Sequence, residues 1–172
     1  MRSRTLSFIG LAVLVLVALV VPSAIATGDP NVRATVSFGQ WQTDPPLDRV
    51  ATPTDRTRNV HLLLPRVAKI KAGGAVNFIV SGFHEPTIYD AGTQPGDINT
   101  ALLVPGSTPP GLIDDPQGRI FRGLDPRTQT QDRVESVRFT KPGTYLVICA
   151  VHPHFVNDGM FGFVEVTDGD DE

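Results

Sequence analysis

Short apolar runs alternate with proline- and glycine-rich turns along most of the chain, and no long segment after residue 26 repeats apolar side chains with helical spacing. Residues 33–38 alternate around Ala34, Val36 and Phe38, which is the pattern of a strand that buries one face. We therefore predict an all-β domain whose strands cover residues 33–38, 61–64, 67–70, 75–80, 87–89, 137–139, 144–150 and 160–166.

The predicted strand at residues 144–150 is apolar on both faces, which is typical of a strand in the middle of a sandwich. Successive strand side chains point to opposite faces, so Cys149 shares a face with Val147. The turn Lys141-Pro-Gly143 comes just before this strand. It predicts a hairpin that joins residues 137–139 to the strand.

Residues 90–135 are the longest stretch without a clear strand pattern, and they contain repeated proline and glycine turn signals. Long irregular loops in compact domains are usually functional or mobile, and the pattern does not distinguish these two roles. Residues 101–104 and 119–121 are apolar enough to pack. We therefore expect the loop insertion to contact the rest of the domain at two points.

The first 26 residues have the layout of a secretory signal peptide. Two arginines precede an uncharged apolar run at residues 5–21, and Ala24 and Ala26 provide a small-residue cleavage site. We expect residues 1–26 to be removed and residues 27–172 to form one exported domain, either periplasmic or extracellular. If cleavage does not occur, residues 5–21 would instead tether the domain to the membrane.

The charge of the exported part excludes a nucleic-acid partner. The predicted signal holds two of the 15 basic residues and none of the 18 acidic ones, so 13 bases and 18 acids remain, a formal net charge of −5. Binding to phosphates requires clustered lysines and arginines, which this part of the chain lacks. Apart from the possible anchor, the composition also offers no basic helix for a membrane surface.

Soft metal ligands are concentrated in one stretch of twelve residues, which contains Cys149, His152, His154 and Met160. Cys149 is the only cysteine, so it has no disulfide partner within the chain. A thiolate, two imidazoles and a weak thioether suit copper in a trigonal His2Cys site with a long axial methionine. Structural zinc sites usually contain more thiolates. The stretch would supply three of the four copper ligands.

The C-terminal forty residues resemble the cupredoxins, the small blue copper proteins. The resemblance lies in Lys-Pro-Gly-Thr-Tyr-Leu-Val-Ile-Cys at residues 141–149, the histidines that follow, and Gly-Met-Phe-Gly-Phe-Val-Glu-Val at residues 159–166. It extends discontinuously back to residue 67 and is weak in the loop insertion. It implies a Greek-key β-sandwich or barrel that holds one copper at its end.

By position, the resemblance implies His84 as the ligand from an earlier loop, Cys149 as the thiolate and Met160 as the axial ligand. Both His152 and His154 have a spacing from Cys149 that occurs in the family. We favour His154, because its five-residue gap to Met160 is nearer the family's usual gap than the seven residues that follow His152. His152 remains the alternative.

Glu85 is a departure from the family pattern, which often has an asparagine after the early histidine to support the loop and the thiolate. A carboxylate here would be able to move the site towards the red or green copper types. His61, the remaining histidine, lies in an apolar run without a sharp loop around it and is a weaker candidate ligand than His84.

We interpret the chain as an exported carrier of one electron with one Cu(I)/Cu(II) ion per chain, most simply a monomer, whose partners are redox proteins. No general base, activated nucleophile or substrate pocket is recognisable in the sequence, so we predict that it is not an enzyme. Two alternatives remain: a copper carrier or storage protein with the same ligands, and a thiol enzyme that pairs Cys149 with a loop histidine. The second leaves Met160 unexplained.

Overall fold

The computed structural model describes residues 32–38, 62–107, 111–130 and 132–168. The predicted signal at residues 1–26, the possible anchor within it, and His61 lie outside these ranges. Within the described ranges, the structure has no helix whose length and apolar character would suit a membrane span.

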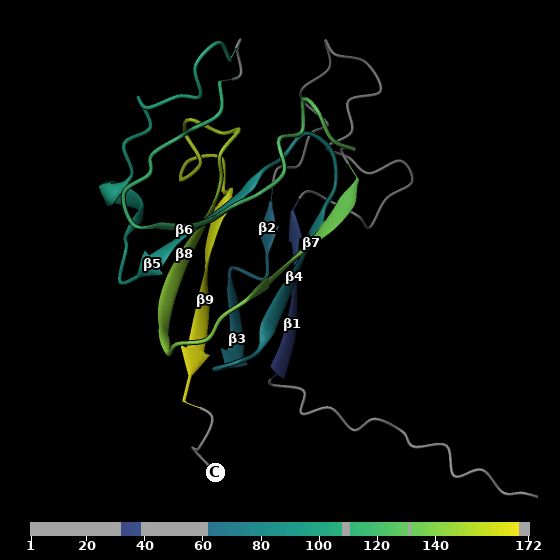
Figure 1. Ribbon diagram of the computed structural model, residues 1–172, viewed down its shortest axis with the longest axis vertical. Helices are drawn as coiled ribbons and strands as arrows, with labels where there is room; N and C mark the ends of the chain where they lie inside the picture. Colours follow the sequence, from purple (N-terminus) through teal and green to yellow (C-terminus); the bar gives the residue numbers. More distant parts are fainter. Residues whose placement is uncertain (1–31, 39–61, 108–110, 131, 169–172) are drawn as a thin grey trace, which may run out of the picture.

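Two mixed β-sheets pack face to face in the described part of the chain (Figure 1). The first has the order β2-β1-β4-β7 and the second the order β3-β9-β8-β5-β6. β1 runs parallel to β4 and β3 runs parallel to β9, while the other neighbours are antiparallel. The bounds are β1 (Arg33–Phe38), β2 (Leu63–Leu64), β3 (Val67–Lys71), β4 (Ala75–Val80), β5 (Pro86–Ala91), the 3-10 helix η3 (Pro95–Asp97), β6 (Arg119–Arg122), β7 (Arg133–Arg138), β8 (Gly143–Cys149) and β9 (Phe161–Thr167).

The core lies between the sheets and follows the apolar alternation of the strands. In β4 every second residue is buried, and Phe78 contacts Phe38 of β1 edge to face, with ring centroids 5.8 Å apart. In β8 all residues from Tyr145 to Cys149 are buried, so this strand is covered on both faces. The loop insertion also contributes to the core, since Leu112 and Ile113 are fully buried.

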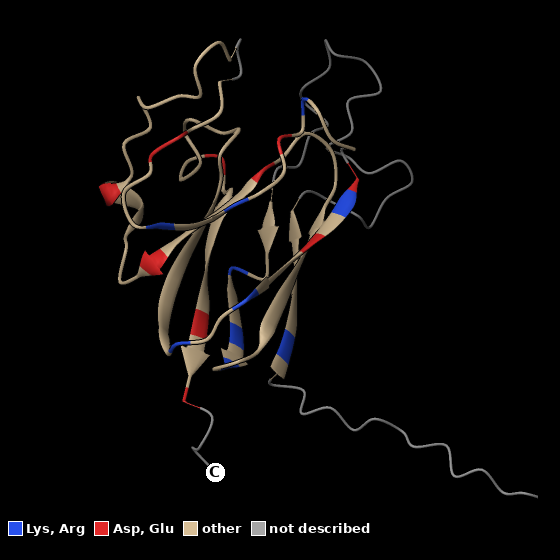
Figure 2. Cartoon of the chain, viewed as in Figure 1, with Lys and Arg blue, Asp and Glu red and all other residues tan. Residues whose placement is uncertain are grey.

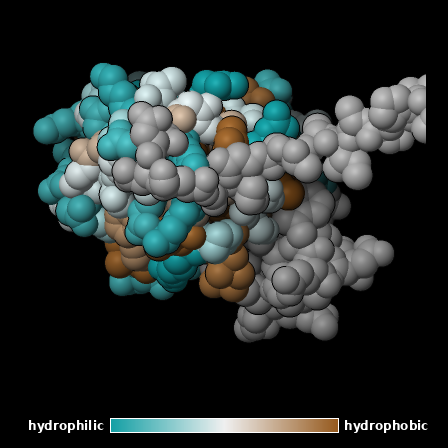
Figure 3. Space-filling model, turned by 90° about the horizontal axis from the view of Figure 1, so that it is seen from below, coloured by the Kyte–Doolittle hydropathy of each residue, from teal (hydrophilic) through white to brown (hydrophobic). Residues whose placement is uncertain are grey.

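Charged and apolar side chains on the surface are distributed unevenly. Basic positions of β1 and β3 lie at the end of the sandwich nearer the C-terminus (Figure 2). Seen from that end, the described surface is mainly hydrophilic, with separate apolar patches (Figure 3).

The predicted all-β Greek-key sandwich with a loop insertion is confirmed, and each predicted strand within the described residues overlaps an observed strand. Most bounds shift by one or two residues, but the strand predicted at residues 137–139 begins four residues earlier, at Arg133. The predicted hairpin of residues 137–139 with 144–150 is wrong. β7 pairs with β4, whereas β8 pairs with β5 and β9 in the other sheet. The turn at Lys141-Pro-Gly143 is therefore a crossover between sheets.

The loop insertion is more ordered than the sequence indicated. Residues 119–122 form β6, which pairs with β5 at the edge of the second sheet. Residues 101–104 contact the domain less fully than predicted, because Leu102 and Leu103 are exposed, although Leu103 forms an isolated bridge with Ile113. Ile113 then donates its backbone N–H to the carbonyl of Ala150 at 2.9 Å. The insertion is thus fixed to the end of β8.

Candidate metal centre

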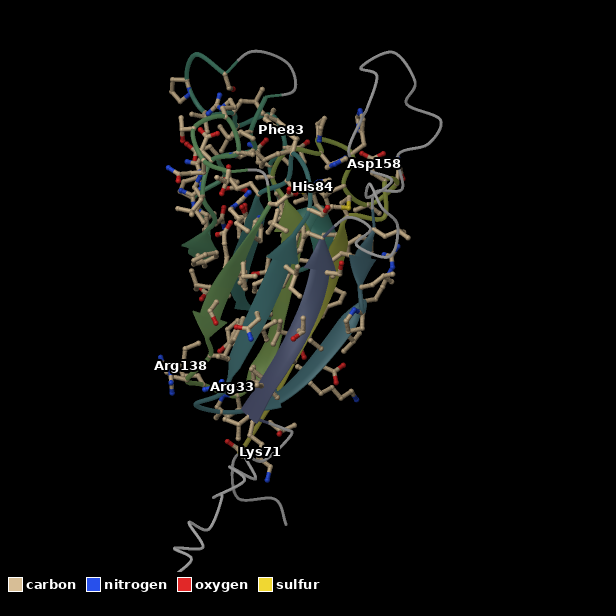
Figure 4. The ribbon with its side chains drawn as sticks, turned by 90° about the vertical axis from the view of Figure 1, so that its right-hand side faces the viewer. Arg33, Lys71, Phe83, His84, Arg138 and Asp158 are labelled. Carbon is tan, nitrogen blue, oxygen red and sulfur yellow. The ribbon has the colours of Figure 1, made fainter. Side chains whose placement is uncertain are left out.

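Three potential ligands meet at the end of the sandwich where β4 leads into β5 and β8 leads towards β9. His84 lies between β4 and β5, Cys149 is the last residue of β8, and His152 follows three residues later. One ligand atom from each lies within 4.8 Å of the others. Figure 4 shows the labelled His84 at this end, opposite Arg33 and Arg138. Among the described residues this is the only such group of histidine, cysteine or acidic side chains.

Strand pairing places His84 beside Cys149. Pro86 is opposite Cys149 in the register of β5 and β8, and the backbone N–H of Ala150 donates to the carbonyl of Glu85 at 2.9 Å. The segment just before β5 is therefore held against the end of β8. As a result, His84 Nδ1 lies 3.4 Å from Cys149 Sγ, and both side chains are buried.

His152 reaches the same cluster from the loop after β8. Its ring stacks on that of His84, with centroids 5.3 Å apart and planes 18° apart. Its Nδ1 also lies 3.1 Å from Oδ2 of Asp158, a residue labelled in Figure 4. A carboxylate on one imidazole nitrogen fixes the orientation of the ring, as outer carboxylates do for metal-bound histidines.

His154, which the sequence favoured over His152, is not part of the cluster. It is exposed, and its backbone carbonyl accepts a hydrogen bond from the N–H of Asp158 at 2.9 Å. The preference came from counting the residues between each histidine and Met160, but the loop closes through successive tight turns, which place His152 inward. The geometry favours the alternative ligand, His152.

Met160 lies beside Cys149 through backbone pairing. The N–H of Cys149 donates to the carbonyl of Met160 at 2.9 Å, and the N–H of Met160 donates to the carbonyl of Phe155 at 2.8 Å. The Met160 side chain is fully buried. The thioether is thus buried on a residue whose backbone pairs with that of Cys149, and its axial role stays a prediction.

The environment of the Cys149 sulfur combines two opposing effects. Burial raises the pKa of the thiol to about 12, while hydrogen bonds from the backbone N–H groups of Glu85, Val151 and His152 lower it. The thiol therefore keeps its proton at neutral pH until a cation replaces that proton. The same N–H groups would then stabilise the thiolate.

Glu85 is engaged away from the cluster. Its carboxyl is fully buried and its Oε1 accepts a hydrogen bond from Arg122 Nε at 2.8 Å. Burial raises the pKa of Glu85, and Arg122 acts in the opposite direction. Its Oε2 has no hydrogen-bond partner among the described residues. The red or green copper alternative would require this carboxylate to leave Arg122.

The donor set fits copper. One thiol and two imidazoles converge in a buried site beside a buried thioether, and this combination of soft and borderline ligands is typical of His2Cys copper centres. A structural zinc site closed by four strong ligands would need another thiolate or imidazole, and the described residues offer neither within the cluster.

Two features of the site were missed by sequence reasoning. Asp158 had no assigned role, although an acid in the loop between two candidate ligands was a possible signal. Arg122 and Arg133 lie far along the chain from the residues that they contact, and no local pattern identified them.

No protein-family model and no curated protein sequence match the chain. Among solved structures, reduced auracyanin from the photosynthetic bacterium Roseiflexus castenholzii is 16% identical, with a TM-score of 0.49 over 79% of this chain and 97% of that one. Plastocyanin from Dryopteris crassirhizoma is 18% identical, with a TM-score of 0.40 over 77% and 99%. A purple cupredoxin from Nitrosopumilus maritimus is 13% identical, with a TM-score of 0.38 over 78% and 99%. Cupredoxins are thus among the solved structures similar to this chain.

Proposed function

We propose that the protein binds one copper ion through His84, Cys149 and His152, with Met160 as a weak axial ligand, and that it carries single electrons between redox proteins. The observation that carries the proposal is the convergence of a thiol and two imidazoles at a buried end of the sandwich, with His84 Nδ1 3.4 Å from Cys149 Sγ. When bound, copper would supply a Cu(I)/Cu(II) couple.

The contribution of the protein is to hold the ligands in a fixed geometry. Cys149 ends a strand that is paired on both sides, and backbone N–H groups form hydrogen bonds to its sulfur. His84 and His152 are held by strand pairing and by Asp158 respectively. Ligands that cannot rearrange suit electron transfer, because little has to move when the charge of the ion changes.

The raised pKa of Cys149 argues against a thiol enzyme. A cysteine nucleophile acts as the thiolate and usually lies in an accessible, electropositive environment. Cys149 is fully buried, and burial raises the pKa of its thiol to about 12. The same sulfur is a suitable metal ligand, since a bound cation removes the proton.

Export is the second part of the proposal. It rests on residues 1–26, whose composition is that of a signal peptide, with Ala24 and Ala26 at the cleavage site. Retention of residues 5–21 as an anchor would leave the same domain attached to the membrane on its exported side. The mass of the protein purified from the exported fraction distinguishes the two, because cleavage removes 26 residues.

The proposal is tested by adding Cu(II) to the metal-free domain and recording the visible spectrum. We expect one equivalent of copper to give an intense charge-transfer band that disappears reversibly on reduction. Cys149→Ser is the matched variant, because it removes the sulfur and keeps a side chain of similar size. It should fold and lack the band. A colourless wild-type protein with stoichiometric Cu(II) would refute the copper-centre proposal.

Two further measurements on the copper-loaded protein distinguish an electron carrier from a copper carrier: repeated oxidation and reduction, and mixing with a metal-free acceptor. An electron carrier retains its ion through repeated oxidation and reduction. A copper carrier with the same ligands releases the ion to a metal-free acceptor on mixing. Retention through the cycles supports electron transfer, whereas rapid release to the acceptor supports the alternative.

A further inference from the structure

The segment at the end of the loop insertion contacts the backbone of a candidate metal ligand. Arg133, the first residue of β7, donates from Nη2 to the carbonyl oxygen of His84 at 2.9 Å. The Arg133 side chain is only 7% exposed, so this contact is shielded from solvent. A residue 49 positions further along the chain thus holds the His84 main chain.

The guanidinium of Arg133 is itself fixed on several sides. Its Nε donates to Glu135 Oε1 at 2.7 Å, and Nη2 also donates to the carbonyl of Leu124 at 2.8 Å. Glu135 is buried too, and its Oε2 accepts the backbone N–H of Leu124 at 3.1 Å. A planar guanidinium held by several acceptors in fixed directions is a rigid support.

Arg122 of β6 makes the corresponding contact with the next residue. Its Nε donates to Glu85 Oε1 at 2.8 Å, and its Nη1 donates to Asp114 Oδ1 at 3.0 Å. Asp114 is anchored by its own backbone N–H, which donates to the carbonyl of Leu102 at 2.7 Å. The two arginines therefore connect His84 and Glu85 to the loop insertion on separate paths.

A further contact joins the segment before His84 to the end of the insertion. Gly82 adopts a φ of 84°, and its N–H donates to Asp132 Oδ1 at 3.3 Å, again at the end of the insertion. Buried ion pairs contribute little to stability compared with apolar residues of the same size, but removing one partner leaves an uncompensated charge. We therefore interpret these ion pairs by the position in which they hold the His84 segment, and not by their contribution to stability.

We propose that Arg133 and Arg122 are positioning residues of the metal centre, which hold the His84-Glu85 segment so that the His84 imidazole faces the Cys149 sulfur. The loop insertion thereby has a function: it supports the ligand-bearing segment from outside the sandwich. The consequence for copper rests on the proposed function, whereas the positioning of His84 over Cys149 does not.

The chain provides a matched control for each arginine. Arg138 lies on β7 like Arg133 and donates to a backbone carbonyl, that of Gly73, at 2.7 Å, but at the opposite end of the sandwich (Figure 4). Arg119 lies on β6 like Arg122 and pairs with Asp114 at 2.7 Å without contacting Glu85. Each control removes an arginine from the same strand. Arg138→Gln leaves both paths unchanged, and Arg119→Gln removes one partner of Asp114 but keeps the bonds of Arg122 to Asp114 and Glu85.

The first measurement uses the metal-free protein and a small thiol-modifying reagent. Cys149 is fully buried, so modification requires local opening of the segment that covers it. In Arg133→Gln and Arg122→Gln, we expect Cys149 to be modified at least about ten times as fast as in wild type. In the controls Arg138→Gln and Arg119→Gln, we expect the wild-type rate of modification. Equal rates in all four variants would overturn the proposal, whether or not the protein binds copper.

The second measurement is copper affinity by competition with a chelator, together with the visible spectrum. Loss of a residue that orients a metal ligand typically lowers affinity by about 10–100-fold, and we expect this range for Arg133→Gln with a shifted band. Wild-type affinity and an unchanged band in a variant that folds would contradict the proposal. If wild type binds no copper, the proposed function fails and the thiol rates alone decide the positioning role.

A variant that does not fold would not decide the matter, so Arg133→Lys is included. It keeps the positive charge beside Glu135 but lacks the planar fork that reaches several acceptors. We expect it to keep the wild-type circular dichroism and to show an intermediate rate of Cys149 modification. A folded Lys variant with the wild-type rate would show that the fork contacts do not position His84.

Discussion

The apolar contacts between β1 and β4 and the polar contacts around the candidate metal site stabilise the molecule by different forces. In β4, apolar side chains alternate with partly exposed ones, and the sheet is stabilised by burial between Phe78 and its neighbours. Around the candidate site, the buried residues include His84, Glu85 and Glu135, and directional hydrogen bonds fix their positions, although Glu135 lies opposite Phe78 in the register of β4 and β7. Apolar packing tolerates small shifts, whereas the polar contacts impose one geometry. The two kinds of contact can therefore be probed with different substitutions.

The largest effect is expected from the apolar region. Phe78→Ala removes a fully buried ring that contacts Phe38, and we expect it to lower the free energy of unfolding by about 3–5 kcal/mol, measured by denaturant titration. Val134→Ala on the neighbouring strand is the control, because Val134 is 61% exposed. It should change stability by about 0.5 kcal/mol or less. Similar losses in both variants would contradict the described core.

A smaller effect, on pH dependence, is expected from Glu85→Gln in the metal-free protein. Burial raises the pKa of Glu85 in the folded state, so folding favours its protonated form. The contribution of Glu85 to the free energy of unfolding is therefore fully present below the usual glutamate pKa. It is lost as the pH rises through the raised pKa of the folded state. Glutamine keeps an acceptor for Arg122 but does not titrate.

The measurement is the free energy of unfolding of both proteins across that pH range. The free energy of unfolding of wild type relative to the glutamine variant should fall as the pH rises from the usual glutamate pKa to the raised pKa of Glu85. Above that pKa it should stay constant. A relative stability that rises with pH would mean that the ion pair with Arg122 outweighs burial, and that the pKa of Glu85 is lowered.

Local patterns predicted the apolar region well for a physical reason. The alternation in residues 33–38 and 75–80 reflects burial of one face, and β1 and β4 have these bounds. The false hairpin shows the limit of such reasoning: Lys141-Pro-Gly143 indicates that the chain turns, but the sheet that β8 joins depends on contacts with β5 and β9. β6 was predicted only as a point of packing, because arginines stand at both of its ends.

The candidate site was predictable in its residue types and less so in its geometry. The cluster of soft ligands identified Cys149, and the resemblance added His84. Residue counting favoured His154, whereas the turns after Cys149 place His152 with His84 and Cys149, so the structure favours the alternative. The contacts of Arg122 with Glu85 and of Arg133 with His84 join residues 37 and 49 positions apart, and only the folded arrangement brings them together.

The most direct test of the copper centre compares His152→Ala with His154→Ala, both loaded with one equivalent of Cu(II). The two histidines share a loop, so each variant controls for loss of an imidazole from it. We predict that His152→Ala loses the charge-transfer band and changes the electron-spin spectrum, while His154→Ala keeps both. Retention of both signals in His152→Ala, with their loss in His154→Ala, would contradict the centre formed by His84, Cys149 and His152.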